Sequence, residues 1–102
     1  MDIGVEISLY PLTRDFVPEI RAFLARLHHH PHLKIVTNSL STQVFGPYEE
    51  VMEALQRELR PTFERAAKES DRAVFVMKVL GPLPPASSGA AWAGGPRGEA
   101  AN

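Results

Sequence analysis

The sequence predicts an α+β fold in which a four-stranded antiparallel sheet carries two helices on one face. Residues 3–10 alternate apolar and polar side chains, as a half-buried strand does, and two later segments carry apolar side chains at helical spacing. Two short apolar runs lie between those segments, and a third follows them. The order strand, helix, strand, strand, helix, strand is that of the ferredoxin-like βαββαβ sandwich. Right-handed crossovers place both helices on the same face of the sheet.

The first strand and the first helix are the clearest elements. Alternation places Ile3, Val5, Ile7 and Leu9 on one face of the strand, which is expected to end at Pro11. Thr13 or Asp15 is expected to cap the following helix, with Pro18 in its first turn. The apolar stripe of this helix is formed by Phe16, Ile20, Phe23, Leu24 and Leu27.

A polar hairpin follows. Residues 33–36 are expected to form the second strand and residues 41–46 the third. Between them, the run Thr37-Asn38-Ser39-Leu40-Ser41-Thr42 presents hydroxyl and amide groups where Gly and Pro are usual. These side chains either close the turn on their own backbone or offer donors and acceptors to a ligand.

The second helix is expected to start at Pro47 and to be kinked or interrupted at Pro61. Its predicted apolar stripe is Tyr48, Val51, Met52, Leu55, Leu59 and Phe63, and its predicted solvated face is Glu49, Glu50, Glu53, Arg57, Glu58 and Arg60. Residues 73–80 form the predicted last strand. Since this strand is apolar on both faces, cover is expected on both sides.

Composition indicates one soluble domain, residues 1–80, followed by a disordered Pro/Gly/Ala-rich tail, residues 81–102, whose Trp92 could dock elsewhere. The net charge of −1 disfavours nucleic acid and anionic membranes as partners. The absence of cysteine excludes disulfides and thiolate chemistry. With neither a signal peptide nor a long apolar run, a cytoplasmic location is expected.

Four histidines, His28, His29, His30 and His32, stand at the end of the first helix. Imidazoles there can bond the terminal carbonyls and, when protonated, complement the helix dipole. Metal ligands on a helix are best placed four residues apart, whereas adjacent histidines point in different directions, and no carboxylate follows nearby in the sequence. No metal and no cofactor is therefore predicted.

The face of the sheet without helices predicts an interface. Glu6, Ser8 and Tyr10 should lie there with Val74, Val76 and Lys78. Ser41, Gln43 and Phe45 are favoured on the same face, although a one-residue slip would exchange them for Thr42 and Val44. Two chains packed sheet to sheet, about 10 Å apart, would leave a pocket between them. A homo-oligomer, a dimer or a tetramer, is expected.

Two segments carry a resemblance to a known family. Ile7-Ser8-Leu9-Tyr10-Pro11-Leu12, with Asp15-Phe16 shortly after, and Thr37-Asn38-Ser39-Leu40-Ser41-Thr42 with Gly46 ahead of a helix together resemble the YkoF-like family. The resemblance covers about residues 3–80, as a single repeat where the thiamin-binding members have two. It implies ferredoxin-like repeats that bind thiamin through its hydroxymethylpyrimidine portion, for uptake, salvage or sensing of the vitamin.

An aminopyrimidine presents an amine donor beside ring-nitrogen acceptors, so its site needs matched polar groups and an apolar wall. Asn38 and Gln43 are assigned to the ring edge and Tyr10 to the wall. Glu6 either accepts from the amine or pairs with Lys78 across the strands. The candidate hydroxyl partners are Ser8, Thr37, Ser39, Ser41 and Thr42.

Catalysis finds little support, since the sequence has no cysteine, no nucleophile elbow and no glycine-rich phosphate loop. The non-enzymatic reading is therefore preferred. The alternatives are a cofactor-free dimeric ferredoxin-like oxygenase or isomerase, which would need a buried His or Tyr, and a purely structural oligomerisation module.

Overall fold

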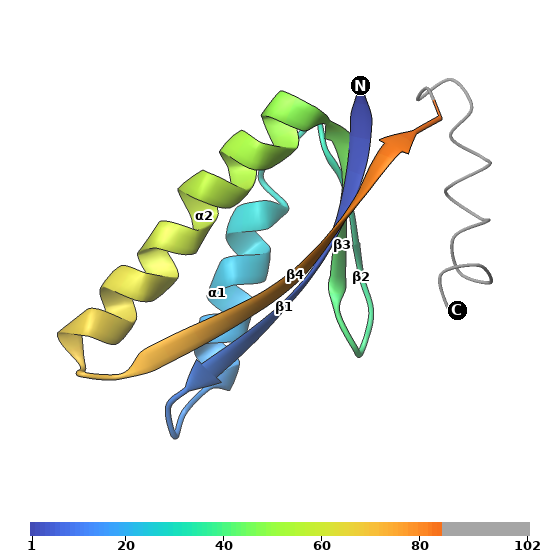
Figure 1. Ribbon diagram of the computed structural model, residues 1–102. Helices are drawn as coiled ribbons and strands as arrows, with labels where there is room; N and C mark the ends of the chain where they lie inside the picture. The colour runs from blue at the N-terminus through green and yellow to red at the C-terminus, as the bar shows by residue number, and fades with distance from the viewer. Residues whose placement is uncertain (85–102) are drawn as a thin grey trace.

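The structure is a computed structural model that describes residues 1–84. Its elements are β1 (Asp2–Leu12), α1 (Val17–Leu27), β2 (Lys34–Thr37), β3 (Thr42–Pro47), α2 (Tyr48–Lys68) and β4 (Arg72–Leu83). The strands form one sheet in the order β2-β3-β1-β4, with every neighbouring pair antiparallel. Both helices lie on the same side of this sheet (Figure 1). The predicted ferredoxin-like fold class is confirmed.

The core lies between the helices and the sheet. Its buried side chains are Ile3, Val5 and Ile7 from β1, Val44 from β3, Phe23 and Leu27 from α1, and Val51 and Leu55 from α2. Burying each such side chain contributes about 1.5–3 kcal/mol, so this small set supplies most of the force that joins helices to sheet. The alternation predicted for β1 is confirmed, because Ile3, Val5 and Ile7 all face this core.

The strand register determines which residues lie on the face without helices, called here the open face. Glu6 pairs with Gln43, and Val5 pairs with Val44. Because paired residues share a face, Gln43 lies on the open face with Glu6, whereas Val44 is buried beneath the helices. The predicted facing of β3 is confirmed, and the one-residue slip is excluded.

Strand β1 does not end at Pro11 as expected, because Pro11 pairs with Ala73 and the strand continues to Leu12. The last residue of β1 that pairs with β3 is Ile7. Beyond it β1 has a neighbour on one side only, so a missing N–H is tolerated there. The boundaries of β2 and β3 also lie one residue later than predicted, at Lys34–Thr37 and Thr42–Pro47.

The cap predicted for the first helix is wrong. Helix α1 begins at Val17, and its N-cap is Phe16, whose side chain makes no capping hydrogen bond. Phe16 is also exposed and not part of the apolar stripe. Pro18 lies in the first turn, as predicted, where its missing N–H costs nothing.

Helix α2 is rotated relative to the predicted stripe. Its buried residues are Val51, Ala54, Leu55, Glu58 and Thr62. Three residues assigned to the stripe, Tyr48, Met52 and Phe63, are exposed, and Glu58, assigned to the solvated face, is only 8% exposed. Pro47 is the N-cap and not the first helical residue. The core face therefore follows the spacing 51, 55, 58, 62 and includes a carboxylate.

Pro61 does not interrupt α2, which runs without a break from Tyr48 to Lys68. Proline cannot donate to the carbonyl of Arg57, and its ring crowds the preceding turn. In that turn the Glu58 carbonyl accepts a hydrogen bond from Arg26 Nη2 at 2.8 Å. A side chain from α1 thus supports the backbone where the helix is weakest.

Strand β4 is one of the two edge strands of the sheet and is not covered on both sides within residues 1–84. Its side chains Val76, Val79 and Leu80 are 51%, 58% and 63% exposed. The strand also extends beyond residue 80 to Leu83, which pairs with Asp2. The first three residues of the predicted tail thus belong to the sheet, while residues 85–102, including Trp92, lie outside the described part of the chain.

Candidate functional site

The hairpin between β2 and β3 is closed by Asn38. Its backbone N–H donates to the Ser41 carbonyl at 3.0 Å, and its side-chain Oδ1 accepts from the N–H groups of Leu40, at 2.8 Å, and Ser41, at 3.0 Å. The Asn38 side chain therefore closes the turn on its own backbone, which is one of the two alternatives that the sequence left open. Within residues 1–84 the amide nitrogen Nδ2 has no hydrogen-bond partner, so the donor half of the amide remains available.

Thr37 and Thr42 lie opposite each other where the hairpin opens into paired strands, with their Oγ1 atoms 3.2 Å apart. Thr42 is 4% exposed and faces the helices with Ile7, its partner on β1. Its hydroxyl therefore approaches a ligand only from the helix side of the hairpin. Thr37 is exposed and can be reached from solvent.

A hollow of about 210 Å³, called here the hairpin pocket, lies between the hairpin, β1 and α1. Seven of the nine predicted ligand-binding residues line it: Ser8, Tyr10, Thr37, Asn38, Ser39, Ser41 and Thr42. Its apolar wall includes Ile20, Phe23 and Leu24 of α1, which the sequence analysis assigned to the core alone. The hydroxyl and amide groups of the hairpin thus face an apolar surface across one cavity.

The other two predicted residues, Glu6 and Gln43, line a second hollow of about 310 Å³ on the open face. Its remaining walls are Gly4, Val5, Phe45, Lys78, Val79 and Leu80, and it is called here the open-face hollow. A Cβ atom on Gly4 would lie 2.8 Å from Cε1 of Phe45. Glycine at this position therefore allows the aromatic ring to lie across β1.

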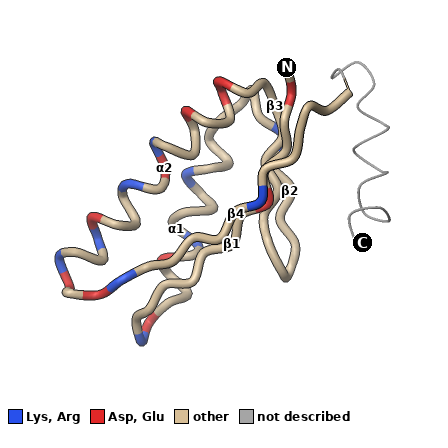
Figure 2. Tube along the Cα trace, viewed as in Figure 1, with Lys and Arg blue, Asp and Glu red and all other residues tan. Residues whose placement is uncertain are grey.

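Glu6 connects the two hollows. Ser41 Oγ donates a hydrogen bond to Glu6 Oε2 at 3.0 Å, while Lys78 Nζ lies 4.0 Å from Glu6 Oε1. The cross-strand pair with Lys78 proposed from the sequence is confirmed. Elsewhere the strands carry few charged residues. Most of the Lys, Arg, Asp and Glu residues lie along α2 and in the loops (Figure 2). A ligand amine near Glu6 would compete with Lys78, whose pairing is long and exposed.

Several polar groups around the two hollows have no partner in residues 1–84. They are the Gln43 amide, the Tyr10 phenol and the Ser39 hydroxyl. Ser8 Oγ makes only a long bond of 3.4 Å to the Leu40 carbonyl. Tyr10 and Ser39 are exposed, whereas Ser8 and Gln43 are half-buried, and together these groups can donate to and accept from a small polar molecule.

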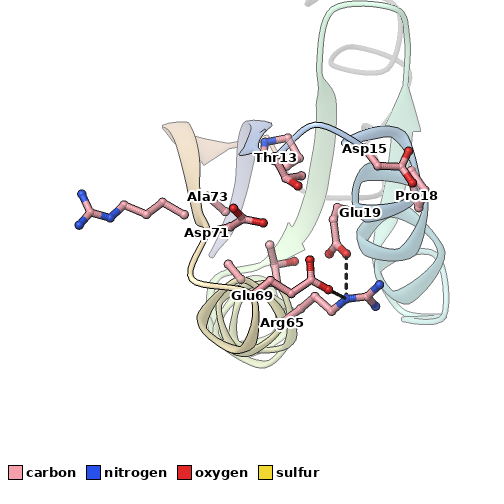
Figure 3. A pocket seen from close by; sticks show the side chains of 12 residues that line it. Thr13, Asp15, Pro18, Glu19, Arg65, Glu69, Asp71 and Ala73 are labelled. Atoms are coloured by element: carbon pink, nitrogen blue, oxygen red, sulfur yellow. Dashed lines mark ion pairs between the residues drawn. The ribbon is translucent and has the colours of Figure 1, made fainter.

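A third hollow, of about 160 Å³, was not anticipated from the sequence. It lies where the start of α1, the end of α2 and the start of β4 meet (Figure 3). Arg65 Nε is 3.3 Å from Glu19 Oε2 and 3.6 Å from Glu69 Oε2, so the guanidinium at its centre is already paired with two carboxylates. This arrangement ties the two helices together.

A buried ionic cluster between the helices was also missed. Glu58 binds Arg26, with Nε 3.1 Å from Oε1, and His30, with Nε2 2.8 Å from Oε2. Its position three residues after Leu55 and seven after Val51 is the signal that places it on the core face. His30 is thus engaged with α2 and lines none of the three hollows.

Within residues 1–84, no three His, Cys, Asp or Glu side chains are grouped closely enough to hold a metal ion. Of the two described helices, neither is long and apolar enough to cross a membrane.

No family model matches the chain, and no curated protein matches it in sequence. Solved structures share its fold. A hypothetical protein from Methanocaldococcus jannascii superposes with a TM-score of 0.67 at 19% identity, covering 82% of this chain and 84% of that one. A domain of unknown function, DUF77, from Bacillus cereus gives 0.63 at 9% identity over 80% and 77%.

A protein from Thermotoga maritima, described as a candidate thiamine biosynthesis/salvage protein, has a TM-score of 0.61 at 16% identity. The match covers 90% of this chain and 99% of the Thermotoga chain. At these identities the similarity concerns the fold. Of these three structures, one carries a name that refers to thiamine.

Proposed function

We propose that this chain is a non-enzymatic binding protein of the YkoF-like kind, which binds thiamin or its hydroxymethylpyrimidine portion. The observation that carries the proposal is the hairpin pocket. Seven side chains selected for the chemistry of an aminopyrimidine line this one cavity, against an apolar wall from α1. The fold shared with the Thermotoga protein described as a thiamine biosynthesis/salvage candidate is a second support.

The polar groups available fit the edge of an aminopyrimidine. Asn38 Nδ2 and the Ser39 hydroxyl are donors for ring nitrogens, while the Ser41 and Thr37 hydroxyls can accept from the exocyclic amine. Ile20 and Leu24, both partly exposed, provide apolar surface for the ring. A ligand lacking these matched groups would leave buried polar atoms unpaired, at about 1–3 kcal/mol each, which gives the site its selectivity.

Glu6 and Gln43 take part from the open face. Glu6 accepts a hydrogen bond from Ser41, a residue of the hairpin pocket. A ligand that binds the hairpin and moves Ser41 would therefore also change the surroundings of Glu6 in the open-face hollow. The carboxylate would also offset a thiazolium charge that extends toward it. The site therefore spans the end of the hairpin and the adjoining strand.

A homo-oligomer formed through the open face is the second part of the proposal. This face carries exposed Val74, Val76 and Leu80 beside Tyr10, an apolar surface that favours association. Two copies packed sheet to sheet would cover it and close the open-face hollow, which Glu6 and Gln43 line, between the subunits of a dimer or tetramer. We propose that such a binding protein serves the uptake, salvage or sensing of the vitamin in the cytoplasm.

The geometry gives the enzymatic alternative less support. The oxygenase or isomerase requires a buried His or Tyr free to act on a substrate. Tyr10 is more than half exposed, and His30 is bound to Glu58 away from the hollows. The alternative of a purely structural oligomerisation module predicts a tightly filled interface that holds no ligand. A ligand titration separates this alternative from the binding protein, because only the binding protein would bind thiamin.

Calorimetric titration with thiamin and with hydroxymethylpyrimidine, combined with light scattering, tests the proposal. Asn38→Asp keeps the turn-closing Oδ1 acceptor and removes the Nδ2 donor, so it should weaken pyrimidine binding about tenfold, the effect of one hydrogen bond of about 1.4 kcal/mol. Gln56→Ala, on the exposed face of α2, should leave affinity unchanged. Absence of binding by the wild-type protein at millimolar ligand would refute the vitamin-binding function.

A further inference from the structure

Strand β4 has a long hydrogen-bonding edge that no other strand of residues 1–84 covers. The sheet order β2-β3-β1-β4 places β1 on one side of β4 and leaves the other side without a neighbouring strand in this part of the chain. Residues 72–80 pair one to one with β1, and the register shifts only beyond Leu80. The regular part of this edge is therefore most of the length of β4.

The β4 edge lacks the features that keep edge strands apart. Edge strands are usually short, or carry charged residues and prolines that prevent pairing with another chain. The opposite edge of the sheet follows this rule, because β2 has four residues and begins with Lys34. In β4, Lys78 is the one charged residue after Arg72, and the first proline is Pro82, beyond the regular part. The β4 edge is therefore open to pairing.

One hydrogen bond determines which backbone groups of β4 point outward. The Tyr48 N–H donates to the carbonyl of Met1 at 2.9 Å, so the backbone groups of Met1 point toward β3. Backbone groups of successive residues in an antiparallel strand alternate between the two neighbouring strands, so the even-numbered residues of β1 bond to β4. Since Glu6 pairs with Lys78, the even-numbered residues of β4 bond back to β1. The residues whose N–H and C=O groups point away from the sheet are Ala73, Phe75, Met77 and Val79.

Apolar side chains are exposed on both faces of this edge. Met77 lies on the helix side, because it pairs with the buried Ile7, yet it is 42% exposed. Val79 lies on the same side and is 58% exposed. A copy packed on the open face would cover Val76 but would leave Met77 and Val79 in solvent. A strand added beside β4 contacts side chains on both faces at once.

We propose that β4 pairs antiparallel with β4 of a second copy of this chain, so that the two sheets continue into one another edge to edge. A two-fold axis at Val76 lets all of residues 72–80 pair, with Val76 opposite Val76 of the second copy and Met77 opposite Phe75. The outward-pointing residues of the two strands then form about eight backbone hydrogen bonds. A typical protein interface has about ten.

The second copy is the occupant because β4 matches itself better than it matches the other edge of the sheet. In the symmetric register Lys78 lies opposite Val74 and Arg72 opposite Leu80, so no like charges are directly opposed. Strand β2 of another copy offers only four residues to pair with. Pairing of β4 with β2 would also leave a free edge at each end and extend into filaments, whereas the two-fold pairing closes.

The pairing adds a residue to the open-face hollow. Leu80 lines that hollow, and Arg72 of the second copy lies directly opposite Leu80 in this register, on the same face of the sheet. The outer wall of the hollow is therefore completed by the second copy. This interface is separate from the sheet-to-sheet packing and does not depend on vitamin binding.

Single introduced cysteines test the register, because the sequence has no cysteine of its own. In Val76→Cys the two Cα atoms would be about 4.5 Å apart, within the range of about 4.4–6.8 Å that a disulfide spans. Val74→Cys is the matched control on the same face, with Val74 43% and Val76 51% exposed. The two Val74 positions would be about 13 Å apart. Sheet-to-sheet packing, at about 10 Å, is too wide for either disulfide.

Mild oxidation at low micromolar protein should convert most of the Val76→Cys variant into a disulfide-linked dimer on a non-reducing gel, while Val74→Cys should stay monomeric. No intermolecular disulfide in Val76→Cys, or equal cross-linking of the two variants, would overturn the proposal. This pair of variants decides the matter without any change to the backbone.

A proline at the edge tests the hydrogen bonds. Met77→Pro removes an outward-pointing N–H and leaves the bonds between β1 and β4 in place, as edge strands tolerate. It should halve the molar mass measured by light scattering, with an unchanged circular dichroism spectrum. Met77→Thr keeps the N–H and should keep the wild-type mass. A folded Met77→Pro variant with the wild-type mass would contradict the pairing. Neither experiment uses thiamin, so these results and those of the vitamin titration stand independently.

Discussion

Arg26 on α1 binds both the side chain and the backbone of Glu58 on α2. Its Nε lies 3.1 Å from Glu58 Oε1, and its Nη2 donates to the Glu58 carbonyl at 2.8 Å and to Thr62 Oγ1 at 3.0 Å. The same carboxylate holds His30 through its second oxygen. One buried carboxylate thus fixes the end of α1 against the middle of α2.

Replacing Glu58 by Ala should lower the free energy of unfolding by about 2–3 kcal/mol, because it leaves the Arg26 guanidinium partly buried without a counter-charge and removes the hydrogen-bond partner of His30. Glu53→Ala is the matched control, since Glu53 forms an exposed pair with Arg57 at 3.9 Å. It should change stability by less than about 0.5 kcal/mol. Urea denaturation measures both, and equal effects would contradict the structural role of Glu58.

Gly4→Ala should lower the unfolding free energy by about 1–3 kcal/mol, because its Cβ would clash with the Phe45 ring. If this contact is the cause, the double variant Gly4→Ala, Phe45→Leu should be less destabilised than the two single effects add up to. A double-mutant cycle based on thermal denaturation gives the coupling. Strict additivity would show that Gly4 is required for another reason.

Pro61→Ala should stabilise the protein by about 1–3 kcal/mol. The new N–H can donate to the Arg57 carbonyl within an already continuous helix, and the crowding of the preceding turn is relieved. Thermal denaturation followed by circular dichroism measures the gain. Gln56→Ala, an exposed change in the same helix, should have an effect below about 0.5 kcal/mol, and a Pro61→Ala variant no more stable than wild type would contradict the expectation.

Val76→Lys tests the proposed interface on the open face. Val76 is opposite Ser8 in the register and half-exposed, so a lysine there is tolerated in the monomer but places like charges together when two sheets pack. Light scattering should show the monomer mass for this variant at concentrations where the wild type is oligomeric. Met52→Lys, an equally drastic change on α2, should keep the wild-type mass.

The fold could be predicted because its signals are local. Alternation from Ile3 to Leu9 and helical spacing around Phe23 and Val51 determine the elements, and their order restricts the topology. The expected end of the strand at Pro11 and the expected interruption of the helix at Pro61 were wrong, because the effect of a proline depends on the elements packed around it. Pro11 lies where β1 is paired on one side only, and the turn before Pro61 is supported by Arg26 from another helix.

The hairpin pocket could be anticipated from side-chain chemistry, but its wall could not. Thr37 to Thr42 are close in sequence, whereas Phe23 and Leu24 reach the pocket only through the packing of α1. Glu58 was assigned to solvent because carboxylates are rarely buried without a partner, and its partners Arg26 and His30 lie 32 and 28 residues away. Pairing at such distances is invisible to local patterns.

Strand β1 pairs with β4 from Asp2, opposite Leu83, to Leu12, opposite Arg72, so the first strand to be synthesised joins the last. At about 5–20 residues per second, roughly 4–16 s separate the synthesis of Asp2 from that of Leu83. During this time the apolar face and one hydrogen-bonding edge of β1 lack their final neighbour. Folding of the sheet is therefore completed after synthesis of the domain, and factors that protect an unpaired strand would matter most for this N-terminal segment.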